Sequence, residues 1–159
     1  MLGKIFYKNK LSKIEYADCA VWCNENDAII EDKGDYYEVV AIPAPSLDEV
    51  KAQKITSLKA QRDNLEVGDI TVDGNTFDYD AKARERINNA IIALQASNGS
   101  ILWTLADNNS VLVTAQDLVA VVSAVAVRSN TLHIAYRDAK AKVNAAMTAE
   151  EVNAVELEV

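Results

Sequence analysis

Three residues of this chain, Cys19, Cys23 and His133, carry side chains that could bind a metal ion or act as nucleophile and base. His133 is the only histidine, so a relay of nucleophile, imidazole and acid would have to depend on it. No glycine-framed nucleophile turn surrounds a serine or a cysteine. We therefore expect a partly exposed structural histidine, no catalytic residues and no enzyme activity.

Zinc is the metal that these residues could hold. Cys19, Cys23 and His133 would supply three ligands, whereas structural zinc sites use four and favour Cys-x-x-Cys or similar spacings. The two cysteines are four residues apart on an expected helix, where they are neighbours without easily reaching disulfide geometry. We expect buried, reduced thiols, no metal and no cofactor. The alternative is a small cytosolic metal- or thiol-dependent enzyme or regulator that uses Cys19, Cys23 and His133.

A second group with metal-binding side chains consists of Asp73, Asp78 and Asp80. The spacing of a calcium loop and its closing glutamate are missing. Asp73 precedes Gly74 in what reads as a two-residue hairpin turn, and Asp78 or Asp80 stands where a helix needs a cap. We expect these aspartates to shape the backbone rather than to hold a cation.

Composition limits the classes of partner. The 159 residues are half apolar and carry a net charge of −8, which predicts a folded, acidic protein. The best basic cluster is only Lys8, Lys10 and Lys13, so nucleic acid is not an expected partner. The longest strongly apolar run, Leu118 to Val127, is about half of the roughly 20 residues that cross a bilayer, and the N-terminus lacks a secretory signal. We expect no membrane partner.

Residues 1–45 predict a small β-α-β-β N-terminal subdomain. The expected elements are a strand at Lys4–Tyr7, a helix at Glu15–Glu25 and a hairpin made by residues 28–30 and 36–42. Pro43 and Pro45 then interrupt regular structure. Ser46 and Glu49 have the spacing of a capping box, which starts a connecting helix over residues 46–66. Its narrow apolar stripe suits a connector or a coiled-coil arm.

Residues 67–159 predict an α+β C-terminal domain. A hairpin around Asp73-Gly74 leads to an amphipathic helix that ends near Ala96, and a second hairpin turns at Asp107-Asn108-Asn109. Thr114 can cap a long helix, and Thr148 a short one. The expected fold class is α+β, mainly helical, with short antiparallel β-hairpins packed against amphipathic helices and one long C-terminal helix.

The long helix and the second hairpin offer the best candidates for partner contact. Apolar residues recur along the helix at alternating spacings of four and three, so this stripe either packs inside the chain or pairs with copies or a partner helix. Trp103 is either a core aromatic or an interface anchor. The predicted partner interface consists of Trp103, Leu118, Val122, Val125, Leu132, Tyr136 and Val143.

Several short motifs occur together in this chain. They are Phe77-Asp78-Tyr-Asp80, Trp103-Thr-Leu-Ala-Asp107-Asn108, Leu112-Val-Thr114, Asp117-Leu118 and Ala145-Ala-Met-Thr148-Ala-Glu-Glu151. Through them, residues 50 to 155 resemble a domain of unknown function seen in phage tail proteins. The front part, with Trp22-Cys-Asn24, the run Tyr36–Val40 and Pro43-Ala-Pro45-Ser46, looks like the leading segment of small phage tail-fibre assembly proteins.

The resemblance implies a non-enzymatic role beside phage tail-fibre or baseplate proteins. The chain would be a fibre-assembly chaperone or a structural tail subunit, present in the host cytoplasm during assembly and, as a subunit, in the virion tail. The family contributes no established catalytic residues. Hairpin edges and helical faces suit contact with partners, or with copies in a homo-oligomer.

Overall fold

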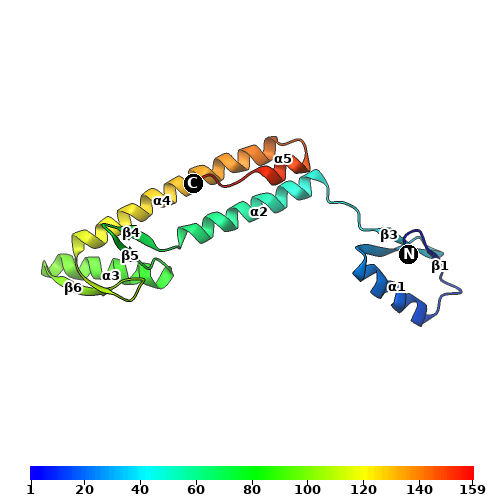
Figure 1. The fold of residues 1–159 in the computed structure, drawn as a ribbon, viewed down its shortest axis with the longest axis horizontal. Helices are drawn as coiled ribbons and strands as arrows, with labels where there is room; N and C mark the ends of the chain where they lie inside the picture. The colour runs from blue at the N-terminus through cyan, green and yellow to red at the C-terminus, as the bar shows by residue number, and fades with distance from the viewer. The chain divides into compact units, whose positions relative to one another are not determined.

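The computed structural model describes all 159 residues, which form two compact units, Met1–Pro45 and Ser46–Val159. Figure 1 shows the elements of each unit. Helices contain 55% of the residues and short antiparallel strands 19%, and the longest helix lies near the C-terminus. The expected α+β, mainly helical fold class is confirmed.

The first unit is one helix packed on a three-stranded antiparallel sheet. Its elements are β1 (Ile5–Tyr7), α1 (Lys13–Glu25), β2 (Ala28–Asp32) and β3 (Tyr36–Ala41), and β3 lies between β1 and β2. Ser12 and Glu15 form a capping box that starts α1, because hydroxyl and carboxylate each accept from an otherwise unpaired amide. Cys19 and Cys23 of α1 pack against Ala28 and Val39 of the sheet.

The second unit alternates helices and hairpins. Its elements are α2 (Leu47–Glu66), β4 (Ile70–Val72), β5 (Asn75–Phe77), α3 (Ala81–Ser97), β6 (Ser100–Thr104), β7 (Ser110–Thr114), α4 (Ala115–Ala145) and α5 (Ala149–Ala154). The strands β4 and β5 pair with each other, as do β6 and β7. Helix α4 runs without a break through Arg128, Ser129 and Asn130, as its apolar register predicts.

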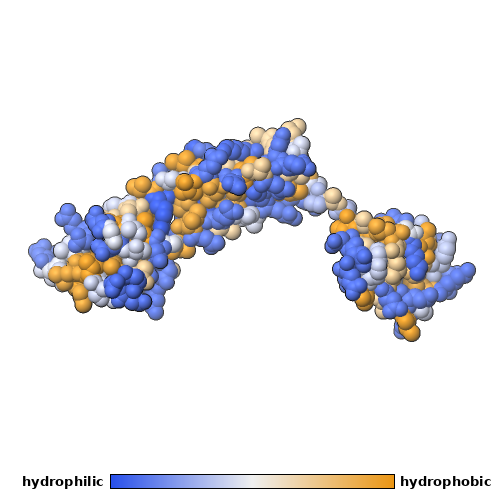
Figure 2. Space-filling model, viewed as in Figure 1, coloured by the Kyte–Doolittle hydropathy of each residue, from blue (hydrophilic) through white to orange (hydrophobic).

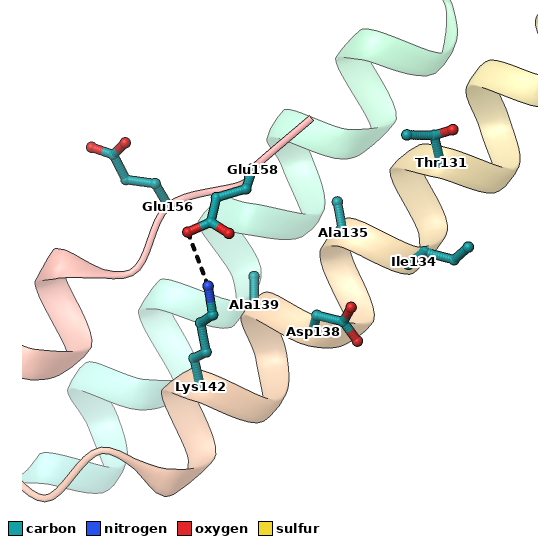
Figure 3. Close-up of a pocket in the computed structure, with 8 residues that line it drawn as sticks. All are labelled: Thr131, Ile134, Ala135, Asp138, Ala139, Lys142, Glu156 and Glu158. Carbon is teal, nitrogen blue, oxygen red and sulfur yellow. Dashed lines mark hydrogen bonds and ion pairs between the residues drawn. The ribbon is translucent and has the colours of Figure 1, made fainter.

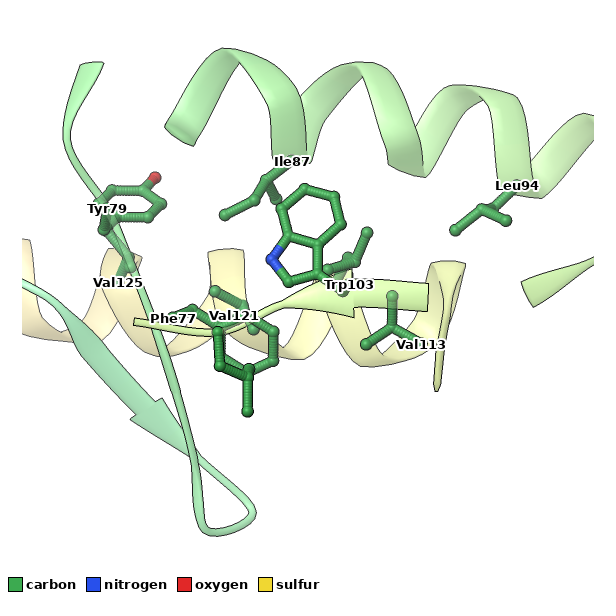
Figure 4. Packing of buried hydrophobic residues seen from close by; sticks show 10 residues of the cluster. Phe77, Tyr79, Ile87, Leu94, Trp103, Val113, Val121 and Val125 are labelled. Atoms are coloured by element: carbon green, nitrogen blue, oxygen red, sulfur yellow. The ribbon is translucent and has the colours of Figure 1, made fainter. Parts of the chain in front are cut away.

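Helix α4 takes part in two hydrophobic cores, which lie along its two halves. The N-terminal half packs with α3 and both hairpins around Ile87, Trp103 and Leu118. Figure 4 shows the Trp103 indole between Ile87 of α3 and Val121 of α4. The C-terminal half packs with α2 and α5 around Leu58, Val143 and Val152.

Helix α2, predicted as a connecting helix, lies antiparallel along α4 in the second unit, and the two are seen side by side in Figure 1. Lys51 near the start of α2 donates to the backbone oxygen of Asn144, 2.9 Å away. The other end of α2 is joined to α4 by Arg128, whose guanidinium donates to the backbone oxygens of Glu66 and Asp69. Antiparallel packing covers part of the narrow apolar stripe that the sequence shows: Leu58 is fully enclosed, whereas Leu65 near the end of α2 stays exposed.

Two details of the helix ends differ from the most common capping chemistry. The left-handed residue after α3 is Asn98, at φ 49°, and not Gly99; asparagine tolerates this region because its short side chain can bond locally. At α5, Thr148 accepts from the amide of Glu151, but the Glu151 carboxylate accepts from Met147 instead of closing a capping box on Thr148.

Candidate partner-binding surfaces

The residues predicted as a partner interface lie mainly inside the second unit. Trp103, Leu118, Val125, Leu132 and Val143 are buried, and Val122 and Tyr136 are half-buried. The Arg62 guanidinium lies over the Tyr136 ring, 4.8 Å from its centroid. In this fold the stripe joins α4 to α2, α3 and the hairpins, so a partner surface has to use other side chains.

The hairpin that carries Trp103 does present apolar residues outward. Leu102 and Leu112 face each other across β6 and β7, and both are exposed. The missed signal was the unbroken apolar run Ile101-Leu102-Trp103, because a strand with one solvent face alternates apolar and polar residues. Residues on both faces of this hairpin are therefore suited to burial.

The first unit has a second apolar surface, the open face of its sheet. Successive residues of a strand point to opposite faces, and Val39 faces α1. The other face therefore carries Ile5 and Tyr7 of β1, Ile29 and Glu31 of β2, and Tyr36, Glu38 and Val40 of β3. Ile5, Tyr7 and Ile29 are exposed, and the rings of Tyr7 and Tyr36 lie 5.9 Å apart.

Charges on this open sheet face are unbalanced. Glu38 lies opposite Glu31 in the register of β2 and β3. Lys33 pairs with Glu31 at 2.9 Å, and the nearby charge of Glu38 also raises the pKa of Lys33. Glu38 itself forms no ion pair within 4.0 Å. A half-buried carboxylate among aliphatic and tyrosine side chains favours a ligand that brings a basic group.

The side chains considered for zinc or nucleophilic chemistry have other roles. Cys19 and Cys23 are free and buried. Burial raises the pKa of the Cys19 thiol, and the neighbouring Cys23 adds to the effect, so Cys19 is a poor nucleophile at neutral pH. No group of three or more histidine, cysteine or acidic residues is arranged to hold a metal ion.

His133 belongs to a polar contact between α4 and the end of α2. Its Nε2 lies 3.0 Å from Oε1 of Glu66, and the Ser129 hydroxyl donates to the same oxygen at 2.7 Å. The side chain is about half exposed. This contact fixes the end of α2 to α4 beside the Arg128 bonds described above.

The aspartates of the other candidate metal site shape the backbone. Asp73 and Gly74 both have positive φ, 50° and 80°, in the turn between β4 and β5, as a type I′ hairpin turn requires. Asp80 is the cap of α3 and accepts from the amide of Ala83 at 2.7 Å. Asp73, Asp78 and Asp80 are not brought together as a metal-binding group.

A surface groove of about 210 Å³ lies between α4 and the segment that follows α5. Figure 3 shows Ala135 and Ala139 directed toward that segment, and Lys142 paired with Glu158 at 2.9 Å. Asp138 and Glu156 add acidic groups at its rim. The polar groups that line the groove are therefore three carboxylates, the Thr131 hydroxyl and the already paired Lys142.

A second hollow, in the first unit, is lined by Lys8, Lys13, Tyr16 and Tyr37 among others. Asp32 holds Lys8 through a hydrogen bond that raises the pKa of the lysine, and the Lys8 ammonium lies 4.7 Å from the Tyr37 ring centroid. The best basic cluster of the sequence is thus partly neutralised within the chain.

Comparison with known families decides the relationship of the second unit. A family model described as a domain of unknown function (DUF4376) matches residues 49–156. The chain belongs to the DUF4376 family. The matched region runs from the first turn of α2 to just beyond α5, so the DUF4376 domain comprises both cores of the second unit. No curated protein and no solved structure matches the chain.

This match confirms the predicted resemblance to a domain of unknown function. The open sheet face of the first unit lies outside the matched residues.

One helix, α4, is long and apolar enough to cross a membrane, a test that the core helix of a soluble protein also passes. Leu118, Leu132 and Val143 of this helix are buried in the two cores, but only 22% of its most apolar stretch is buried.

Proposed function

We propose that this DUF4376 protein is a non-enzymatic component of a bacteriophage tail or tail-fibre assembly that acts through protein-protein contacts. It serves either as a structural tail component or as a chaperone for fibre assembly. The phage setting is supported by the motif resemblance of both parts of the sequence. The family description itself carries no function.

The observation that best supports an interaction role is the open sheet face of the first unit. A three-stranded sheet in water usually covers one face and leaves the other polar, but here Ile5, Tyr7 and Ile29 are exposed. Tyrosine and isoleucine at a surface gain more from contact with a partner than from water. A protein surface with aliphatic side chains and one lysine or arginine opposite Glu38 fits this face.

Fractionation of infected cells tests the proposal. The chain should co-purify with a tail-fibre or baseplate protein identified by mass spectrometry. A fixed stoichiometry in purified particles would identify a structural component. Presence only in the lysate, bound to fibre protein, would identify a chaperone. If the chain co-purifies with no tail protein in either fraction, the proposed function is wrong.

A further inference from the structure

Besides the β6–β7 hairpin, the second unit has an unpartnered, largely apolar surface on α4, opposite its buried stripe. At 100° per residue, Val119, Ser123, Ala126, Val127, Asn130 and Ile134 fall within about one third of the helix circumference. All six are exposed. We call this set the outer face of α4. Figure 2 shows hydrophobic surface along the middle of this helix.

The outer face differs in charge from the rest of the molecule. One quarter of the chain is charged and its net charge is −8, yet none of the six residues of the outer face is charged. Arg137, three residues after Ile134 on the same side of the helix, is paired with Asp138, and Arg128 is bonded to the backbone of Glu66 and Asp69. Two acidic copies can approach each other most closely through a neutral surface, because like charges elsewhere repel.

The order of residues on the outer face is complementary to itself. If two α4 helices lie antiparallel, with the two-fold axis between Ala126 and Val127, three kinds of pair form. Val119 meets Ile134 of the second copy, Ser123 meets Asn130, and Ala126 meets Val127. Each pair is apolar with apolar or polar with polar, and small residues near the axis allow the helices to approach closely.

We propose that the outer face of α4 is a homodimer interface in which a second copy of the chain packs antiparallel about the midpoint of Ala126 and Val127. This inference does not depend on the phage assignment. The contact runs from Val119 to Ile134, which are about 22 Å apart along the helix. A patch of this size belongs with weak interfaces, so a dissociation constant on the order of 10–100 µM is expected.

Sedimentation velocity of the full chain over a wide concentration range measures this association. Wild-type protein should shift from monomer to dimer as concentration rises. Val127→Glu should weaken the dimer at least about tenfold, because it sets two carboxylates beside the axis. Ile92→Glu on α3 is the matched control, since Ile92 and Val127 are 68% and 69% exposed, and it should leave the dimer unchanged. Circular dichroism establishes that both variants fold.

Disulfide crosslinking tests the antiparallel register in a Cys19→Ala, Cys23→Ala background. Ser123→Cys protein mixed with Asn130→Cys protein should form the mixed disulfide faster than either forms a disulfide with itself. Two copies of residue 123 would be offset by about 10 Å along the helices, beyond the usual reach of a disulfide of about 7 Å between Cα atoms. Faster self-crosslinking of each variant would indicate parallel packing and overturn the proposal.

A membrane is the competing occupant of the outer face. Basic residues that would attract an anionic bilayer are absent from it. Co-sedimentation with phosphatidylcholine and phosphatidylglycerol vesicles separates the two cases. A chain that stays monomeric at all concentrations, or that binds vesicles in a manner lost in Val127→Glu, contradicts the homodimer.

Discussion

At the scale of single residues, Trp103 and its strand neighbour Leu102 show how one apolar run serves two surfaces. The Trp103 side chain is 7% exposed and Leu102 is 70% exposed. Arg86 lies over the indole, 4.9 Å from the ring centroid. Trp103 thus stabilises the second unit, while Leu102 is free for contact.

Replacement of Trp103 by alanine should lower the free energy of unfolding by about 3–5 kcal/mol, because it leaves a cavity among buried side chains. Leu102→Ala on the same strand is the control and should cost less than about 1 kcal/mol. Urea unfolding followed by circular dichroism measures both. Equal losses would show that the hairpin is not packed as described.

The thiols give a second residue-scale prediction. Because burial raises the pKa of Cys19, a disulfide reagent at neutral pH should react with the native chain far more slowly than with the chain unfolded in guanidinium. Absorbance of the released thiolate follows the reaction. If the thiols of the native chain reacted as fast as those of the unfolded chain, the result would favour the alternative of a thiol-dependent enzyme or regulator.

The sequence predicted the buried stripe of α4 but not what covers it. Burial inside the chain and burial by a second copy both require apolar residues at alternating spacings of four and three, so Leu118 and Leu132 look the same in either case. The stronger signal was that Leu118 to Val127 is apolar at nearly every position, including the outer face. A helix that is apolar all round has to be covered on more than one side.

At the scale of elements, capping chemistry sets where the helices begin. The Thr114 hydroxyl accepts from the Asp117 amide, and the Asp117 carboxylate accepts from the backbone of Thr114 at 2.8 Å. Such spacings are local, so the sequence predicted the start of α2 and of α4. The pairing of α2 with α4 depends on residues far apart in the chain. The sequence therefore predicted α2 only as a connecting helix or a coiled-coil arm.

Thr114→Ala should lower the free energy of unfolding by about 1 kcal/mol through loss of the cap. Thr131→Ala is the control, since Thr131 is exposed in the middle of α4 and its hydroxyl bonds only to the helix backbone. That change should be neutral or slightly stabilising, because alanine favours helix. An equal loss in both variants would argue against a capping role.

The same cap predicts a pH dependence. Hydrogen bonds from Thr114 hold the pKa of Asp117 below its ordinary value of 3.8. A lowered folded pKa gives stability that is present above the unfolded value and lost as pH falls through the folded one. Unfolding titrations from pH 6 downward should therefore show a shallower acid loss for Asp117→Asn than for wild type. If the stability of Asp117→Asn and of wild type fell equally with pH, Asp117 would not be a cause of the acid loss.

At the scale of the whole molecule, the two units bring different surfaces. The first presents the open sheet face, and the second presents the outer face of α4. If both proposals hold, a dimer formed through α4 carries two copies of the sheet face, and two weak contacts on one partner assembly raise the overall affinity. Catalysis needs titratable groups with shifted pKa values in a cleft. Binding through the open sheet face and the outer face of α4 needs only exposed apolar side chains.

The most direct test of the interaction role compares variants of the open sheet face in capture of the co-purifying tail protein. Ile5→Ser combined with Tyr7→Ser removes two exposed apolar groups from that face. Ile14→Ser on α1 is the control, because Ile14 is even more exposed than Ile5 and Tyr7 but lies off the sheet. We expect the double variant to fold and to lose the tail protein, while Ile14→Ser retains it. Full retention by the double variant would contradict a partner-binding role for this face.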